Sequence, residues 1–407
     1  MTTEAPLWPS ARTLRAPLPE STDVLIVGGG LAGTALAYYL GRAGVECVLV
    51  EHAELNREAS GTNAGSFHFQ IAIHQLTALE TGNVRERLQT EVRLHAEAAE
   101  VWKTLERELA GPLEIHITGG LMVAETPGEL RLLHEKRELE EEAGLETHVL
   151  EGEELRSFAP YLAEDLLGAT WCPDEGHANP MLAAPLFAVR AAEAGAELRT
   201  HAGVTRIDVD PAGGARRFSV TTAAGRIYAH RIVNATGAWA NDLAALVGQR
   251  LPIRAEGLHL NVTEPREHVL VPMVQHIGRR LTLKQSTSDT FIIGGGWPAN
   301  PEPPPRRFST RWESTAGNVA VAVRVVPLLA DVRIVRTWSG VMAFTEDLAP
   351  IVGDSGRLPG FYTLIATTGF TLSPLLAQLL AEELATGRSA IPPEYSVDRA
   401  SAQATTT

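Results

Sequence analysis

The sequence predicts an α/β fold of two parts: a parallel-sheet domain assembled from separated pieces of the chain, and an inserted α+β domain built on an antiparallel sheet. Residues 23–51 have the pattern strand, glycine turn, helix, strand, and residues 361–387 repeat strand, turn and helix near the other end. Between them, Leu258, Leu260 and Val262 alternate with polar residues, which indicates antiparallel sheet. The parallel-sheet domain is therefore expected to be discontinuous.

The first of these stretches, residues 23–51, carries a pattern typical of dinucleotide binding. An apolar run at 24–27 stops at Gly28, and Gly28, Gly30 and Gly33 fill a G-x-G-x-x-G frame. Gly28 permits the tight turn, Gly30 lets the backbone approach a phosphate, and Gly33 lets the following helix close onto the strand. Unpaired N–H groups at the start of that helix then face the anion. We therefore expect the pyrophosphate of a dinucleotide at this turn, in a Rossmann-like domain.

An acidic residue follows the second strand of the unit. The strand at 47–50 ends in Glu51, 21 residues after Gly30. A carboxylate at this place accepts hydrogen bonds from both ribose hydroxyls of an adenosine and disfavours a 2′-phosphate. A βαβ unit that binds no nucleotide is the alternative, but strand, amphipathic helix, closing Gly44 and terminal acid agree here. The motif alone does not say which dinucleotide is bound.

The composition is that of an ordinary globular protein, with 407 residues, 44% apolar and 21% charged. A formal net charge of −14 argues against nucleic acid or an anionic membrane surface as a partner. Cys47 and Cys172 are too few for a disulfide framework and form no metal-binding pattern, so no metal is expected and a cytoplasmic location is the simplest interpretation. Nowhere do about eighteen apolar residues run together, so no membrane span is expected.

Hydrophobic periodicity predicts the remaining elements. Helices are expected at 83–110, 127–143, 180–194, 313–329 and 372–384, and strands at 115–123, 196–210, 218–220, 231–235, 332–341 and 361–366. We interpret Glu138 and Glu140 to Glu142 as the solvated face of their helix. The expected division is an extended lead-in (1–22), a cofactor domain (23–80, 150–250 and 335–390), a substrate domain (81–149 and 251–334) and a tail (391–407).

Seven motifs, in order, resemble one family. They are DVLIVGGGLAG with Glu51, ASGTNAGS at 59–66, TGGLMVAE at 118–125, VNATGAWA at 233–240, LKQSTSDTFIIGGG at 283–296, WSGVMAFTEDLAPIVGD at 338–354 and GFTLSP at 369–374. Together they resemble the D-amino-acid oxidase family of flavoproteins, the group that contains glycine oxidase, sarcosine oxidase, and the hydroxyproline dehydrogenase and opine oxidase subunits. The resemblance covers nearly the whole chain after Ser21.

The resemblance implies a glutathione-reductase-like cofactor domain and FAD, rather than NAD, as the cofactor. Gly340 stands where a cysteine tethers the flavin in monomeric sarcosine oxidase, so FAD is expected to bind non-covalently. At the N-terminus of the helix expected at 372–384, the N–H groups of Phe370, Thr371 and Leu372 are expected to stabilise the negative charge of a reduced flavin. The residues implied to line FAD are Gly28, Gly30, Leu31, Ala32, Gly33, Glu51, His52, Ser60, Asn63, Ala64, Gly65, Ser66, Val204, Ala235, Gly237, Trp239, Gly340, Gly369, Phe370, Thr371 and Leu372.

The chemistry that this resemblance implies is hydride removal from the carbon next to an amine, giving an imine that water hydrolyses. Such an amine must be neutral, which a dry pocket promotes. Lys284 is expected either to hold a water or favour oxygen reduction, or to be a surface lysine. His68 and His259 are candidates for the pocket, with a satisfied or solvated histidine as the alternative for each.

The substrate pocket departs from that of glycine oxidase. The arginine that follows the W-x-G element in that group is absent, because Trp338-Ser339-Gly340-Val341 leads to Met342. Met342 and Phe344 indicate a more apolar pocket, for a bulkier secondary amine or an N-substituted amino acid. Arg279 or Arg280 is expected to clamp its carboxylate.

Three functions remain open on the sequence. The first is an FAD-dependent amine or imino acid oxidoreductase that uses oxygen. The second is the catalytic subunit of a heteromeric amine or opine dehydrogenase, which passes electrons to a partner. The third is a flavin-binding protein without amine chemistry. Homo- or hetero-oligomers are both compatible with the sequence.

Overall fold

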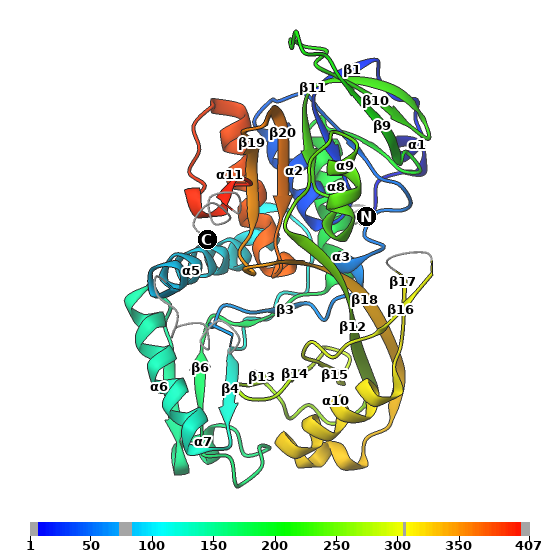
Figure 1. The fold of residues 1–407 in the computed structure, drawn as a ribbon. Helices are drawn as coiled ribbons and strands as arrows, with labels where there is room; N and C mark the ends of the chain where they lie inside the picture. Colours follow the sequence, from blue (N-terminus) through cyan, green and yellow to red (C-terminus); the bar gives the residue numbers. More distant parts are fainter. Residues whose placement is uncertain (1–6, 73–83, 304–306, 400–407) are drawn as a thin grey trace.

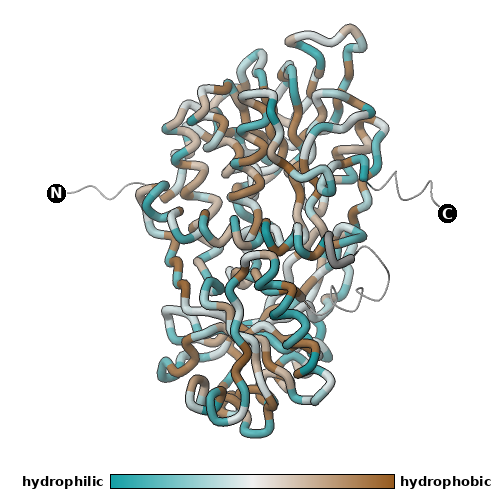
Figure 2. Tube along the Cα trace, turned by 90° about the vertical axis from the view of Figure 1, so that its left-hand side faces the viewer, coloured by the Kyte–Doolittle hydropathy of each residue, from teal (hydrophilic) through white to brown (hydrophobic). Residues whose placement is uncertain are grey.

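The computed structural model describes residues 7–72, 84–303 and 307–399. It contains two eight-stranded sheets, drawn one above the other in Figure 1, and two small two-stranded ribbons. The ribbons pair β3 (Ser66–Phe67) with β7 (Gly176–His177) and β16 (Asn300–Glu302) with β17 (Arg307–Ser309). Apolar stretches run through both halves of the molecule in Figure 2, so each sheet has a core of its own.

The first sheet has a parallel centre. Its strands are β1 (Ser21–Val27), β2 (Cys47–Val50), β8 (Glu197–Arg199), β9 (Val204–Val209), β10 (Phe218–Thr222), β11 (Gly225–Asn234), β19 (Ile351–Ser355) and β20 (Leu358–Ile365). Their main order is β19-β20-β11-β1-β2-β8, and β9 and β10 form an antiparallel hairpin whose strand β10 pairs with β11. The pairs from β20 to β8 are parallel, so β1 lies in the middle with residues 24–27 buried on both faces.

Helices cover one face of this sheet. α2 (Leu31–Arg42) packs between α8 (Pro180–Glu193) and α11 (Gly369–Thr386), and these helices join Val24 and Ile26 in one core. The opposite face, with Leu25 and Val27, packs against β9, β10 and α9 (Ala240–Ala245). Alternate side chains of β1 therefore pack into two separate hydrophobic cores, one on each face of the sheet.

The second sheet is mostly antiparallel. Its strands are β4 (Gly120–Ala124), β5 (His148–Glu151), β6 (Gly168–Cys172), β12 (Ile253–Pro265), β13 (Met273–His276), β14 (Thr282–Gln285), β15 (Thr290–Gly294) and β18 (Ile334–Thr345). The order is β18-β12-β15-β14-β13-β4-β6-β5. One face packs against α10 (Trp312–Val325) and α7 (Gly152–Phe158), and the other turns toward the first sheet (Figure 1).

The remaining elements are short or lie between the sheets. They are α1 (Ala11–Leu14), α3 (Ala59–Thr62), α5 (Val84–Glu108), α6 (Pro127–Glu142), and the 3₁₀ turns η2 (Gly237–Trp239), η3 (Pro327–Asp331) and η4 (Pro393–Tyr395). α6 begins with a capping box between Thr126 and Glu129. Among the described helices, none combines the length and apolar character that a membrane crossing requires.

Several sequence expectations need correction. β6 pairs with β4 and β5 pairs with β6, so the segment up to Cys172, which the boundary at 150 assigned to the cofactor domain, belongs to the second sheet. Glu140 is fully buried against Lys136, although Glu138 is exposed as expected. The lead-in is not simply extended, because Leu14 is buried and its carbonyl accepts a hydrogen bond from the Thr200 N–H.

The alternation at 258–263 is real, but its faces are reversed. His259, Asn261 and Thr263 are at most 1% exposed, whereas Leu258 and Leu260 are half-buried. The polar side chains are covered by α10, where the Asn261 amide donates to Asn318 Oδ1 at 3.0 Å. The apolar side chains therefore form the face that turns toward the first sheet.

Candidate active site

Two helices begin at the same edge of the first sheet. β1 and β20 are both parallel to β11, so their carboxyl ends meet at one edge, and α2 and α11 start directly after them (Figure 1). Neither helix has a capping side chain on its N-cap residue, which is Gly30 in α2 and Thr368 in α11. Both positive helix ends are thus directed to the edge where an anionic ligand would bind.

The glycine turn leaves no room for side chains. Gly28 has φ +118°, and a Cβ there would lie 2.5 Å from the Ala235 carbonyl oxygen. A Cβ at Gly33 would lie 2.0 Å from the Gly28 carbonyl oxygen. Ser60 completes the turn, because its Oγ accepts a hydrogen bond from the Leu31 N–H at 2.9 Å. The turn is therefore a cradle of bare backbone at the start of a helix, the kind of site that binds a phosphate group.

Glu51 is fixed at the far end of the cradle. Its carboxylate accepts hydrogen bonds from the N–H groups of Gly29 at 2.7 Å and Ala53 at 2.9 Å, and its Oε1 lies 2.6 Å from His52 Nδ1. Burial opposes ionisation, but the hydrogen bonds from His52, Ala53 and Gly29 outweigh it and hold the pKa of Glu51 below its ordinary value. The ring of His52 lies 6.1 Å from that of Trp239. An ionised acceptor and two rings are thus available for a nucleoside.

The loop after α3 is folded by its own side chains. Asn63 accepts a hydrogen bond from the Gly65 N–H at 2.6 Å and donates to the carbonyls of Ala59 and Ser60. The Asn63 side chain therefore shapes the loop. Ser66, which follows, is 5% exposed, and its hydroxyl finds no hydrogen-bond partner within the described part of the chain. A buried hydroxyl of this kind indicates room for a ligand atom beside it.

β3 lies against the first turn of α11. The rings of Phe67 and Phe370 stack at 6.0 Å, and the His68 N–H donates to Thr371 Oγ1 at 3.3 Å. The expected role of Leu372 is wrong, because its N–H donates to the Thr368 carbonyl inside the helix. The helix starts at Gly369, so Leu372 is its fourth residue and only the N–H groups before it are left unpaired by the helix. The N–H groups of Phe370 and Thr371 lie before this first helical hydrogen bond, so the role expected for them stays a prediction.

Lys284 lies deep on the face of the second sheet that turns toward these helix ends. The side chain is 3% exposed, and no carboxylate in the described ranges pairs with it. Burial lowers the pKa of this amine to about 7. His68 is near enough that burial, together with the charge of Lys284, lowers its pKa to about 4. The structure therefore places the partly buried His68 near the buried Lys284 amine.

His259 is not part of this site. It is 1% exposed on the opposite face of the sheet, and its Nε2 lies 3.1 Å from Thr315 Oγ1 on α10. The expectation fails because the side chains of β12 alternate between the faces of the sheet, and residue 259 points toward α10.

The pocket candidates on β18 share the face of Lys284. The register pairs Gly340 with Leu258, and a Cβ at Gly340 would lie 2.4 Å from Thr62 Oγ1. Gly340 is thus required for α3 to pack on the sheet. Met342 and Phe344 follow at alternate positions on that face, and the guanidinium of Arg254 lies 5.3 Å from the Phe344 ring.

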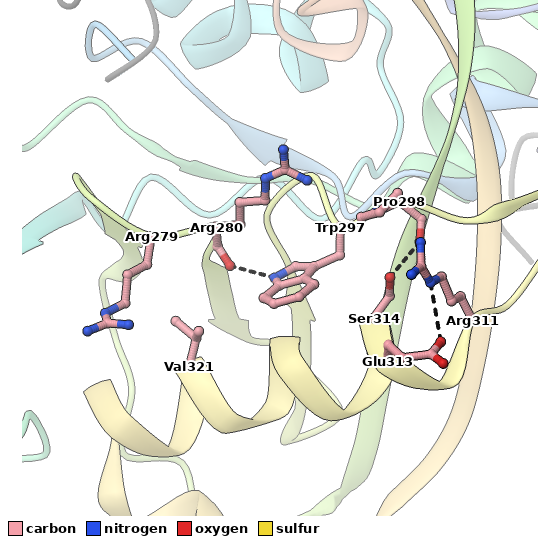
Figure 3. Close-up of a pocket in the computed structure, with 8 residues that line it drawn as sticks. All are labelled: Arg279, Arg280, Trp297, Pro298, Arg311, Glu313, Ser314 and Val321. Carbon is pink, nitrogen blue, oxygen red and sulfur yellow. Dashed lines mark hydrogen bonds and ion pairs between the residues drawn. The ribbon is translucent and has the colours of Figure 1, made fainter.

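Arg279 and Arg280 separate in the structure. Figure 3 shows the two side chains leaving the loop in different directions, with the guanidinium of Arg280 pointing away from α10. Arg279 Nε donates to the carboxylate of Glu125. Arg280 donates to the Gly296 carbonyl at 3.2 Å, and in the parts of the chain that the structure describes it has no carboxylate partner. Arg279 is therefore used structurally, and only Arg280 is available to an anionic ligand.

The structure contains a buried polar network that the sequence did not predict. Glu175, which is 0% exposed, accepts hydrogen bonds from the N–H groups of Phe69 at 2.8 Å and Gln70 at 3.0 Å. Lys136 Nζ donates to the side chains of Gln70 at 2.7 Å and Glu140 at 2.8 Å. The network holds the segment that carries His68. The acidic run of α6 looked solvent-exposed in the sequence, because the residues that bury Glu140 come from distant parts of the chain.

One acidic cluster resembles a metal site by composition only. Glu125, Glu129 and His276 bring their ligand atoms within 4.8 Å of one another. His276 Nδ1 accepts hydrogen bonds from the N–H groups of Gly278 and Arg279, so Nε2 carries the proton and is not a cation ligand. We assign the cluster to the ion pairs of Glu125.

These features define a class of protein: oxidoreductases that bind a dinucleotide at the carboxyl edge of a parallel sheet and close its reactive end with an antiparallel sheet. Comparison with known proteins gives the family. The model of the FAD dependent oxidoreductase family (DAO) matches residues 23–383, and the chain belongs to this family. Its cofactor is FAD, and that group fits the cradle, the N-termini of α2 and α11, and the Ser66 hydroxyl, which has no partner among the described residues.

Several relatives are similar over long stretches. Mitochondrial sarcosine dehydrogenase of Mus musculus is 28% identical over 85% of the chain, and the match covers 37% of that protein. An opine oxidase subunit of Rhizobium meliloti is 26% identical over 90% of the chain and 94% of its own length. The crystal structure of L-proline dehydrogenase from P. horikoshii matches with a TM-score of 0.84 and 25% identity, covering 95% of this chain and 99% of that one. The chain thus spans well under half of sarcosine dehydrogenase but nearly all of the opine oxidase subunit.

Proposed function

We propose that the protein removes a hydride from the carbon next to the nitrogen of a secondary amine or N-substituted amino acid. The observation that carries this proposal is the environment of Lys284, where burial lowers the pKa of an amine to about 7. A substrate amine placed beside Lys284 experiences the same loss of solvation, and so gives up its proton near neutral pH. The neutral amine has the lone pair that forms the C=N bond when the hydride leaves.

The residues divide the task. When bound, FAD supplies the hydride acceptor at flavin N5. The N–H groups of Phe370 and Thr371, at the start of α11, stabilise negative charge on the reduced ring. Lys284 and the face of β18 around Met342 keep water away from the reacting carbon. The remaining proton leaves the iminium nitrogen to water, and hydrolysis of the imine releases the amine and a carbonyl product.

The names of the relatives support an N-substituted amino acid. They include sarcosine dehydrogenase, dimethylglycine dehydrogenase and 4-methylaminobutanoate oxidase of Paenarthrobacter nicotinovorans. Position 342, where glycine oxidase is expected to hold an arginine, carries Met342. An apolar side chain there favours an N-alkyl group over a small free amino acid.

A second candidate is the catalytic subunit of a heteromeric dehydrogenase. The match to the opine oxidase subunit over 94% of its length supports it. In that case the electrons pass to a partner protein instead of oxygen. We place either form in the cytoplasm, a proposal supported by two buried free cysteines, Cys47 and Cys172.

Anaerobic bleaching of the flavin tests the proposal. The purified, FAD-loaded protein is mixed without oxygen with a panel of primary amines, secondary amines and opines, and absorbance at the visible flavin band is followed. Bleaching by secondary amines supports the proposed reaction. If the whole panel leaves the flavin oxidised, amine chemistry is excluded. Peroxide release in air then separates an oxidase from a dehydrogenase that needs a partner.

A further inference from the structure

We propose that Arg280 binds a carboxylate of the substrate that lies several bonds away from the oxidised carbon. This inference rests on the proposed function and specifies its substrate class. Lys284 lies on β14, and Arg280 precedes the start of that strand at Thr282 by two residues. Within the strand, Thr282 and Lys284 point to the same face of the sheet. Figure 3 shows the Arg280 guanidinium pointing away from α10, which covers the opposite face.

The backbone of Arg280 is held firmly. Its carbonyl accepts a hydrogen bond from the Trp297 indole N–H at 2.7 Å. Gly295 has φ +122°, and a Cβ there would lie 2.5 Å from the Leu281 nitrogen. The glycine-rich end of the LKQSTSDTFIIGGG motif therefore allows two segments to cross closely and fixes where the arginine starts. A fixed starting point reduces the entropy lost when the side chain binds an anion.

Among the residues that the structure describes, no carboxylate pairs with Arg280. Its neighbour Arg279 donates to Glu125, and Arg311, across the same surface hollow, pairs with Glu313 at 3.2 Å. Arg280 meets only the Gly296 carbonyl among the described side-chain contacts. In a chain with net charge −14, an arginine without a carboxylate partner is available for an acidic ligand.

The surface between Arg280 and Lys284 is low. Thr282 has a short side chain, and its partner across the ladder is Gly294, which has none. A Cβ at Gly294 would lie 2.6 Å from Leu260 Cδ2, so Leu260 leans over this position. Leu260 therefore gives the interval between Arg280 and Lys284 an apolar surface on which methylene groups can pack.

The spacing selects the kind of substrate. The chain between Arg280 and Lys284 can separate their Cα atoms by up to roughly 13 Å, and its last part, from Thr282, is strand. Both side chains are long, but a single α-amino acid head group is too short to occupy both ends of this interval. We therefore infer an N-alkylated amino acid whose carboxylate is separated from the oxidised carbon by several bonds.

The test compares a matched pair of probes, 4-methylaminobutanoate and its carboxamide, which differ only in charge. Stopped-flow anaerobic reduction of the FAD-loaded protein gives a dissociation constant and a limiting rate for each. We expect Arg280→Gln to raise the dissociation constant of the acid about 10- to 100-fold, the size of a lost charge-assisted hydrogen bond, and to leave that of the amide and both limiting rates unchanged. Arg279→Gln is the matched control and is expected to change neither constant.

A second measurement separates this inference from the proposed function. Glutarate, which is not oxidised, is titrated into the oxidised protein and the flavin spectrum is followed. Weaker glutarate binding in Arg280→Gln, with no loss in Arg279→Gln, supports the inference even if no amine bleaches the flavin. The inference is overturned if Arg280→Gln weakens binding of the acid and the amide equally. It is also overturned if Arg279→Gln and Arg280→Gln change the dissociation constants by the same factor.

Discussion

Lys284→Met is the change whose energetic consequence is most directly worked out from the structure. Burial lowers the pKa of the Lys284 amine from 10.5 to about 7, and an unfolded chain restores the ordinary value. A difference of this size corresponds to roughly 5 kcal/mol, at about 1.4 kcal/mol per pKa unit. Because Lys284 is 3% exposed, solvent screening reduces this figure little.

The sign follows from proton binding. Between pH 7 and 10.5 the unfolded chain holds a proton on Lys284 and the folded chain does not, so the free energy of unfolding rises with pH across this window. Below pH 7 both states are protonated and the folded state carries the full cost of a buried charge. Lys284→Met removes that cost, so the variant is expected to be more stable than the native protein at pH 7, by up to roughly 5 kcal/mol, and about equal to it near pH 10.5.

Urea unfolding followed by far-ultraviolet circular dichroism, at pH 7 and at several values up to pH 10, measures the difference. Lys103→Met is the control, since Lys103 forms ion pairs with Glu100 and Asp174 at 2.7 Å. A stability difference between native protein and Lys284→Met that stays constant with pH would refute the argument. It would show that the amine is not neutral in the folded state.

The same variant is also expected to slow reoxidation of the reduced flavin by oxygen.

Three further changes test the cradle, the nucleoside end and the buried network. Gly33→Ala is expected to abolish FAD binding, measured as flavin absorbance per protein, because its Cβ would lie 2.0 Å from the Gly28 carbonyl oxygen. Glu51→Gln is expected to weaken FAD binding about 10-fold in a fluorescence titration. The carboxylate of Glu51 accepts hydrogen bonds from two backbone N–H groups, whereas the NH2 group of the glutamine amide cannot accept one. Lys136→Met is expected to lower the free energy of unfolding by about 3–5 kcal/mol, because it leaves Glu140 buried without its partner.

Each of these changes has a matched control. Gly128→Ala, where a Cβ would meet nothing closer than 3.8 Å, is expected to retain FAD, and full FAD content in Gly33→Ala contradicts the cradle. Glu46→Gln alters an exposed acid, and an equal loss of affinity there would assign the effect of Glu51→Gln to overall charge. The double variant Lys136→Met/Glu140→Leu is expected to regain part of the stability. No recovery would show that the loss comes from packing alone.

The sequence by itself determined the elements whose signals are local. The glycine frame, the acid at Glu51 and the helix expected at 372–384 each depend on a short stretch, because backbone conformation is set largely by neighbouring residues; the structure starts that helix three residues earlier, at Gly369. The expected convergence of α2 and α11 follows from the parallel order of β1, β11 and β20. These features were enough to predict the cofactor domain.

The tertiary structure alone decided which polar residues meet. His259 and Lys284 are both on strands of one sheet, yet opposite faces place one under α10 and the other in the site. Arg279 and Arg280 are adjacent, and only the position of Glu125 shows which is occupied. Glu140 looks solvated in an acidic helix until Lys136 and the segment after β3 cover it. The physical reason is common to all three: burial and pairing depend on residues far away in the chain, and a strand or helix pattern does not specify which face another element will cover.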